Sequence, residues 1–158
     1  MTIRIGFGYD VHAFAPGRPL ILGGVTIPSE RGLTGHSDAD VVIHAIVDAL
    51  LGAVALGDIG QYFPSNEERW KNQPGSVFLD YTYGLLYQHQ YKISNIDTTI
   101  VAEHPKMAPH IDAMRTHLSE HLHLTIDQVS VKATTTDGLS FTGRQEGIAC
   151  YAVALIET

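Results

Sequence analysis

Side chains that bind metal ions or move protons recur at short, regular spacings in the first third of the chain. The segment "YDVH" places Asp10 and His12 two residues apart, and residues two apart on a strand point to the same side. In "HSDADVVIHAIVDALLG", which begins at residue 36, Asp40, His44 and Asp48 recur every four residues within an apolar run. Four residues advance a helix by about 40° beyond one turn, so these three side chains share roughly 80° of arc.

Two histidines and one carboxylate are the ligand set of a catalytic zinc that keeps one position open. Taken singly, a D-x-H motif is typical of a solvated loop, and a histidine in an apolar helix is more often a satisfied core residue. Taken together, Asp10, His12 and His44 predict a divalent metal site. Asp40 or Asp48 would hold the second nitrogen of a ligand imidazole. We interpret the polar stripe as the lining of a small site and the rest of the helix as core.

A second candidate site lies in "ATTTDGLSFTGR", from residue 133 to residue 144. Threonine hydroxyls and free backbone N–H groups at an Asp-Gly turn suit phosphate oxygens, and Asp137 suits a hard cation such as Mg²⁺. Lys106 stands just before an expected helix start and suits a phosphate or a base. A polar turn between strands is the alternative interpretation.

The elements that must position these residues follow from hydrophobic periodicity and turn residues. We expect the first helix from about Ser37 to Leu56, capped by Ser37 or Asp38, and a long surface loop over 57–75. Strands are expected over 2–12, 19–28, 92–103, 128–134 and 147–157, and further helices over 76–91 and 110–122.

This order predicts a single α+β domain over residues 1–158, with a mixed four- to five-stranded sheet and about three helices on one face. The segment from about 92 to 133 reads as a right-handed parallel crossover. The last strand is apolar on both faces, so we expect the second face of the sheet to pack on other subunits. A central strand covered by loops is the alternative.

Composition narrows the class of protein. The 158 residues are 44% hydrophobic and carry a formal net charge of −7, which argues against nucleic acid or an anionic membrane as the main partner. No apolar segment is long enough to span a bilayer, and no secretory signal follows Met1. The single cysteine, Cys150, lies in the apolar run "GIACYAVALI" and is expected in the core rather than as a nucleophile. We therefore expect a cytoplasmic protein.

Motifs along essentially the whole chain resemble one enzyme family. "RIGFGYDVHAF", "LILGGVTIP", "HSDADVVIHAIVDALLGAVALGDIG", "PKMAPHI" and "VKATTTDGLSFTGRQEGIACYAVALI" are similar to the 2-C-methyl-D-erythritol 2,4-cyclodiphosphate synthases. The resemblance implies a lyase of the non-mevalonate isoprenoid pathway. Such a lyase converts 4-diphosphocytidyl-2-C-methyl-D-erythritol 2-phosphate to the cyclic diphosphate and CMP. It also implies a homotrimer with its active sites between subunits.

The resemblance assigns roles to individual residues. It implies one Zn²⁺ per subunit on Asp10, His12 and His44, and Mg²⁺ or Mn²⁺ on Asp137 with the substrate diphosphate. For the reaction that the resemblance implies, His36 and Thr135 are our candidates for transition-state hydrogen bonds. Phe141 and Arg144 would line a cavity on the trimer axis that holds isoprenoid diphosphates. The implied substrate-binding set is Asp10, His12, His36, Ser37, Asp58, Ile59, Gly60, Phe63, Pro64, Ser65, Asn66, Glu67, Ala102, Pro105, Lys106, Met107, Ala108, Thr134, Thr135, Thr136, Asp137, Phe141 and Arg144.

Three positions depart from the family pattern. Asp137 stands where glutamate is usual, "FPSNE" stands where acidic residues and threonine are more familiar, and Tyr151 stands where a glutamate often accompanies Phe141 and Arg144. Two other functions are considered. A zinc-dependent phosphohydrolase would use the same ligands with water as nucleophile, and a trimeric module binding nucleotides or isoprenoid diphosphates would carry a structural zinc. Structural zinc usually has four protein ligands, often cysteines, and this chain has one cysteine.

Overall fold

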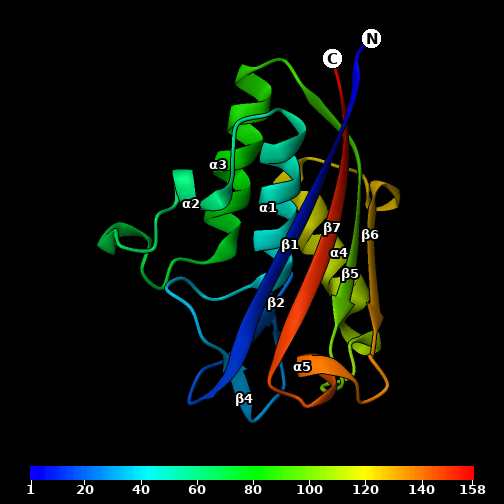
Figure 1. The fold of residues 1–158 in the computed structure, drawn as a ribbon. Helices are drawn as coiled ribbons and strands as arrows, with labels where there is room; N and C mark the ends of the chain where they lie inside the picture. Colours follow the sequence, from blue (N-terminus) through cyan, green and yellow to red (C-terminus); the bar gives the residue numbers. More distant parts are fainter.

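The computed structural model describes residues 1–158 and is built around a twisted five-stranded sheet (Figure 1). Strand β1 (Ile3–Pro16) pairs antiparallel with β7 (Gly147–Glu157), and β7 pairs antiparallel with β5 (Lys92–Val101). Strand β6 (Val129–Thr134) runs parallel to β5, and β4 (Arg31–Leu33) closes the other edge on β1. The mixed sheet predicted from the sequence is confirmed, and its one parallel pair is joined by a helix.

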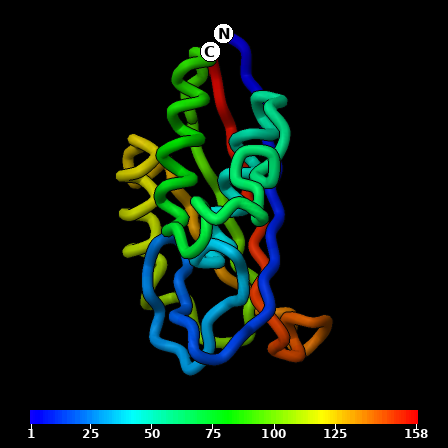
Figure 2. The backbone as a smooth tube through the Cα atoms, turned by 90° about the vertical axis from the view of Figure 1, so that its left-hand side faces the viewer, coloured from blue at the N-terminus to red at the C-terminus, as the bar shows by residue number.

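Three substantial helices cover one face of this sheet. They are α1 (Val41–Ala53), α3 (Gly75–Gln88) and α4 (Ile111–Leu122), and in Figure 2 α3 and α4 lie on the same side of β1 and β7. Two short helices, α2 (Ile59–Tyr62) and α5 (Ser140–Gly143), and three 3₁₀ turns (Glu68–Trp70, Ala108–His110, Ile126–Gln128) lie in the connections. No helix has the length and apolar character needed to cross a membrane.

Helix α1 is the centre of the core, because nearly all of its side chains are buried. It begins later than predicted, at Val41, and its cap is Asp40, whose side chain accepts from the N–H groups of Val42 and Ile43. The predicted caps, Ser37 and Asp38, are wrong, and both side chains have other partners. Ser37 Oγ lies 3.1 Å from a histidine nitrogen, and Asp38 accepts from the N–H of Gly75 at 2.8 Å.

Two glycines allow α1 to pack with its backbone directly on β1. A Cβ built on Gly8 would lie 1.9 Å from the carbonyl oxygen of Ala45, and one on Gly6 would lie 1.8 Å from that of Ala49. No side chain fits at such distances, so only glycine permits this approach. The contact sets the spacing between the strand and the helix that carry the candidate metal ligands.

Two connections differ from prediction. The segment expected as one strand over 19–28 is a hairpin of β2 (Leu20–Leu22) and β3 (Val25–Ile27). Its turn uses positive φ at Gly23 and Gly24, which glycine adopts at little cost. The expected surface loop over 57–75 is partly buried, because the ring of Phe63 packs 4.5 Å from that of Phe78 and the Trp70 ring lies 5.0 Å from Phe63. Aromatic packing outweighs the polar composition of this loop.

The second face of the sheet is apolar and uncovered within one chain. This open face consists of Ile3, Ile5, Phe7, Tyr9, Val11 and Tyr151, all exposed. Ile5 keeps 71% of its surface accessible and Phe7 63%. Monomeric proteins rarely expose a contiguous apolar patch of this kind. The alternate side chains of β7 face α1, where Cys150 is fully buried, as predicted, and burial raises the pKa of its thiol.

Candidate metal and substrate site

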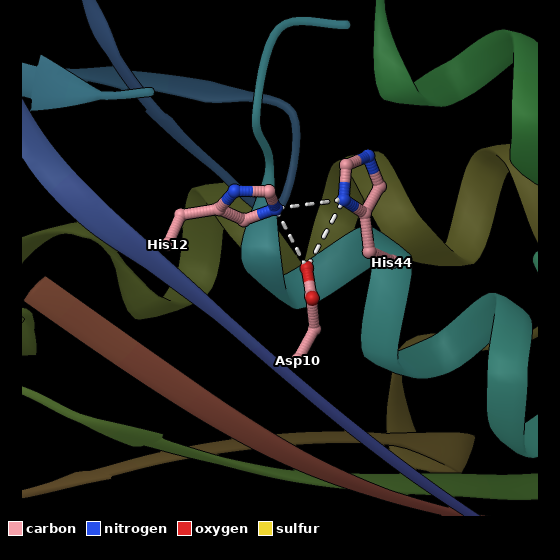
Figure 3. Close-up of side chains that lie close together, drawn as sticks. All are labelled: Asp10, His12 and His44. Atoms are coloured by element: carbon pink, nitrogen blue, oxygen red, sulfur yellow. Dashed lines mark hydrogen bonds and ion pairs between the residues drawn. The ribbon is translucent and has the colours of Figure 1, made fainter. Parts of the chain in front are cut away.

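Asp10, His12 and His44 converge where β1 passes the first turns of α1 (Figure 3). Asp10 Oδ2 lies 2.9 Å from His12 Nε2 and 3.1 Å from His44 Nδ1, and the two imidazole nitrogens are 3.2 Å apart. The two β1 side chains share a side because they are two residues apart, as expected. The close contact at Gly8 places His44 opposite them. The sequence-predicted triad is therefore brought together.

The far nitrogen of each imidazole has its own partner. His12 Nδ1 lies 2.7 Å from the carbonyl oxygen of Thr34, and His44 Nε2 lies 3.1 Å from Ser37 Oγ. A carbonyl only accepts, so Nδ1 of His12 carries a proton, and Nε2 is the nitrogen that faces the cluster. Partners of this kind orient imidazole ligands at metal sites.

The expectation that Asp40 or Asp48 would orient a ligand imidazole is wrong. Asp40 is fully buried and accepts from the N–H groups of Gly23 and Gly24 at 2.9 and 2.7 Å, in addition to capping α1. Asp48 accepts from the N–H of Ile59 at 2.7 Å. A spacing of four separates neighbours by about 6 Å along the helix axis, slightly more than one turn. The three stripe residues therefore reach different parts of the structure, and only His44 reaches the cluster.

The charges of the cluster are coupled. Burial alone would raise the pKa of Asp10, but hydrogen bonds and charge from His12 and His44 outweigh it and lower that pKa to about 2. Burial alone would lower the pKa of His12, and Asp10 instead raises it. A permanent carboxylate and two imidazole nitrogens, all converging, match the donor set that Zn²⁺ prefers with one position left open. The residues present therefore fit a divalent metal ion.

A cavity of about 230 Å³ adjoins the cluster. It is lined by Asp10, His12, His36, Ser37, His44, Ile59, Gly60, Phe63, Ser65, Trp70 and Phe78. The lining includes most of the N-terminal residues expected at the substrate. Trp70 and Phe78 were not anticipated. The signal for Trp70 was present, since the sole tryptophan of the chain stands in a segment of polar and turn residues, where a large aromatic side chain indicates a buried contact.

Neighbours of the lining residues frame this cavity without lining it. Asp58 caps α2 by accepting from the N–H of Gln61 at 3.1 Å. Glu67 contributes its carbonyl oxygen, 2.9 Å from His36 Nε2. Pro64 and Asn66 lie between lining residues in the same loop but are not part of the lining.

The remaining expected residues lie away from this cavity within one chain. They are Ala102, Pro105, Lys106, Met107, Ala108, Thr134, Thr135, Thr136, Asp137, Phe141 and Arg144, none of which lines it. Met107 is buried, Lys106 is exposed, and Arg144 pairs with Glu146 at 2.9 Å. One chain therefore presents two separate groups of expected site residues.

The threonine turn differs from prediction in its backbone. Glu103 Oε1 accepts from the N–H groups of Thr136 at 3.0 Å and Gly138 at 3.3 Å, so these two donors are not free. Their hydrogen bonds, Thr136 first, lower the pKa of Glu103. Asp137 is exposed at the tip of the turn, and its Oδ1 accepts from Thr135 Oγ1 at 3.3 Å. The side chains of the turn remain accessible.

The fold and the site together define an α+β protein with a preformed divalent-metal triad beside a small-molecule cavity. Residues 3–157 match the family model described as the YgbB family, and the chain belongs to this family. It is 55% identical over 154 residues to the 2-C-methyl-D-erythritol 2,4-cyclodiphosphate synthase of Bacillus cereus strain B4264, covering 98% of each chain.

Solved structures agree with this membership. The bifunctional IspDF of Campylobacter jejuni superposes with a TM-score of 0.95 at 39% identity, over 98% of this chain and 42% of that one. The CDP complex of Plasmodium falciparum IspF gives 0.86 at 36% identity, over 98% of this chain and 95% of the other. A CDP-bound 2C-methyl-D-erythritol-2,4-cyclodiphosphate synthase gives 0.89 at 36% identity, over 98% and 100%.

Proposed function

We propose that this chain is a 2-C-methyl-D-erythritol 2,4-cyclodiphosphate synthase, a phosphorus–oxygen lyase of the non-mevalonate isoprenoid pathway. Its substrate is 4-diphosphocytidyl-2-C-methyl-D-erythritol 2-phosphate. The observation that carries the proposal is the Asp10–His12–His44 triad, with its ligand atoms 2.9–3.2 Å apart beside the cavity. The curated relatives, which carry this name at 54–55% identity over 98% of the chain, support it.

The reaction is an internal phosphoryl transfer. An oxygen of the 2-phosphate forms a bond to the β-phosphorus, and the bond from that phosphorus to the oxygen bridging the α-phosphate breaks. CMP leaves with the electron pair. Both reacting groups belong to one molecule, so holding its two ends supplies much of the rate. No protein nucleophile is needed, and the buried Cys150 is not one.

We assign the metal ions as one Zn²⁺ per subunit on Asp10, His12 and His44, and Mg²⁺ or Mn²⁺ with the diphosphate near Asp137. When bound, divalent ions supply positive charge that offsets the repulsion between the two phosphates. The chain's own groups do the positioning. The N–H groups of Gly35, His36 and Ser37 have no partner within the chain and lie in the segment that lines the cavity. Such donors suit phosphate oxygens. His36 and Thr135 are the residues we place at the transition state.

The active unit in this proposal is a homotrimer with its sites between subunits. The open face supports assembly, because its exposed isoleucines and aromatic rings need a cover. The separation of the two groups of site residues supports a shared site. The cavity of one subunit would be completed by the segment from Ala102 to Ala108 of a neighbour, at the cytidine end. Phe141 and Arg144 would line a cavity on the trimer axis. Tyr151 would change the polarity of that cavity, because it stands where a glutamate often accompanies these two residues. A reducing cytoplasm remains the expected compartment.

Product analysis tests the reaction. Purified protein with Zn²⁺, Mg²⁺ and the substrate is expected to release CMP and a cyclic diphosphate in equal amounts, resolved by phosphorus NMR. A linear diphosphate or free phosphate would instead show hydrolysis, with water as the nucleophile. Binding of CDP without turnover would show a binding module. Either of the last two outcomes contradicts the proposal.

A further inference from the structure

The segment Thr34–Ser37, between β4 and α1, carries the residues expected at the substrate diphosphate, and each of its four carbonyls is held by a donor. His12 Nδ1 lies 2.7 Å from the Thr34 oxygen, and the N–H of Asn72 donates to the His36 oxygen at 2.9 Å. The other two carbonyls, those of Gly35 and Ser37, share one donor side chain. Arg18 Nη1 and Nη2 reach them, each at 2.8 Å.

Holding a carbonyl also aims the N–H of the same peptide unit. A trans peptide is planar, with its C=O and N–H on opposite sides, and the only cis bond of the chain is His104–Pro105. The unit that gives its Gly35 oxygen to Arg18 therefore presents the His36 N–H in the opposite direction. That N–H has no partner in the chain. A charged donor on the carbonyl also strengthens the N–H as a donor, because hydrogen-bonded groups polarise one another.

The second bond of Arg18 fixes the other end of the segment. It holds the peptide unit between Ser37 and Asp38, whose N–H donates to the Gln73 oxygen at 3.1 Å. Ser37 itself faces the cluster, with Oγ 3.1 Å from His44 Nε2. One guanidinium thus braces the peptide units on both sides of the His36–Ser37 pair.

We propose that Arg18 is a positioning residue for the synthase reaction, which orients the His36 N–H toward the substrate diphosphate and fixes the Ser37 end of the segment without touching the substrate. The inference rests on the proposed function. Two donors in a fixed fork are needed to span two carbonyls, which a guanidinium provides and a single ammonium does not. The half-buried side chain borders a cavity of about 350 Å³ on its outer side, with Asp38 and Asn72 in the lining, so a small cation can reach the vacated position.

The test compares Arg18→Ala with Arg115→Ala in the zinc-loaded enzyme. Arg115 bridges two carbonyls in the same manner, from Nε to Val129 at 2.8 Å and from Nη2 to Ile126 at 2.9 Å, but it lies on α4 away from the cavity. At metal sites, loss of an outer partner that orients a ligand typically costs about tenfold to a hundredfold in metal affinity or activity. We therefore expect Arg18→Ala to lower kcat/KM by about tenfold to a hundredfold with zinc content unchanged, and Arg115→Ala to keep kcat and KM.

Two further measurements separate positioning from structural support. Millimolar guanidinium should restore part of the activity of Arg18→Ala and none to Arg115→Ala, and Arg18→Lys should fall between wild type and Arg18→Ala. Unchanged kcat and KM in Arg18→Ala would overturn the inference. So would an activity loss that guanidinium and lysine do not relieve, or one that follows lost zinc. Wild-type protein that makes no cyclic product would instead refute the proposed function.

Discussion

At the scale of single residues, His44 is the side chain through which α1 contributes to the metal cluster, whose other two residues lie on β1. Its ring is held by Ser37 on one side and lies 5.8 Å from the Phe78 ring. We expect His44→Ala to lose stoichiometric zinc and to lower activity by more than the roughly 10- to 100-fold that removal of an outer partner costs. The apolar contacts of α1 remain, so the fold should be kept.

Metal analysis and far-UV circular dichroism check this expectation. The matched control is His121→Ala, because His121 also pairs with a carboxylate, Asp80, at 2.7 Å, but on α4. That variant should retain normal zinc and activity. Normal zinc content in His44→Ala would show that the cluster is a hydrogen-bonded trio rather than a metal site.

The coupled charges of Asp10 and His12 predict a pH dependence for the metal-free chain. The Asp10 pKa falls from 3.8 to about 2 on folding, so its contribution to the free energy of unfolding is full above pH 3.8 and is lost toward pH 2. The His12 pKa rises above 6.5, so its contribution is full below pH 6.5 and is lost as pH rises through the folded value. The difference in unfolding free energy between wild type and Asp10→Asn should therefore peak between about pH 4 and 6.5. Urea titrations across this range, in chelator, measure it. A difference that does not vary with pH would contradict the coupling.

Asp137 is one of the three departures from the family pattern, and its exposed carboxylate is expected to serve the Mg²⁺ site. Asp137→Asn should raise the Mg²⁺ concentration needed for half-maximal rate, because the ion loses a charged partner. Asp137→Glu should be neutral or should lower that concentration. Steady-state rates over a Mg²⁺ series give the answer. An unchanged Mg²⁺ dependence in Asp137→Asn would leave the residue as a turn former, consistent with its φ of 53° beside Gly138.

At the scale of elements, Asp40 joins the start of α1 to the β2–β3 hairpin. Its carboxylate accepts four backbone N–H groups at 2.7–3.1 Å in a fully buried position. Burial, then the charge of Asp38, raises the pKa of Asp40 to about 6. Replacing the side chain with alanine removes the cap and leaves buried backbone N–H groups without an acceptor. Asp40→Ala should therefore lower the unfolding free energy by about 3 kcal/mol.

Urea unfolding monitored by circular dichroism tests this loss. Asp112→Ala is the control, since Asp112 is an exposed carboxylate in the first turn of α4, 3.3 Å from Arg115. It should change the unfolding free energy by less than about 1 kcal/mol. An equally small change in Asp40→Ala would show that the hairpin and α1 are held by apolar packing alone.

The elements were predictable to the extent that their residues obey a period. The alternation of β1 and β5 and the helical stripe of α4 are visible in the sequence and appear in the structure. The cap of α1 was misplaced because three neighbouring residues, Ser37, Asp38 and Asp40, are all of types that cap helices. Only tertiary contacts distinguish these candidates. Asp40 accepts from the N–H groups of Gly23 and Gly24, in a hairpin 16 or 17 residues earlier in the chain. The hairpin was missed because its two strands have three residues each.

The site was predictable where its ligands are short-range neighbours and not where packing decides. Asp10 and His12 follow from a D-x-H motif on a strand, and His44 from a polar break in an apolar helix. The partners of their imidazoles, Thr34 and Ser37, are set by the path of the segment after β4, which no periodicity encodes. Trp70 and Phe78 line the cavity because the loop that carries Trp70 packs against Phe78 of α3.

At the scale of the whole molecule, the open face predicts assembly. We expect a homotrimer of about 50 kDa, three times the chain mass of 17.2 kDa. A charge placed at the exposed Ile5 should prevent assembly, because it would have to be desolvated in the interface. Multi-angle light scattering should therefore show about 17 kDa for Ile5→Lys, with native circular dichroism and no activity. Wild type that is monomeric at micromolar concentration would remove the shared site.

Strand β1 carries most of the open face on one side and Asp10 and His12 on the other, so assembly through this face would tie catalysis to protein abundance. Anything that binds the folded state adds to its stability by mass action, and here the added partner would be further copies of the same chain. The concentration of a trimer varies with the third power of the free monomer concentration. On dilution the fraction of chains in trimers would therefore fall abruptly rather than gradually. Specific activity would then fall below a threshold of chain concentration, and a cell making too little of this chain would possess folded, metal-loaded subunits that do no chemistry.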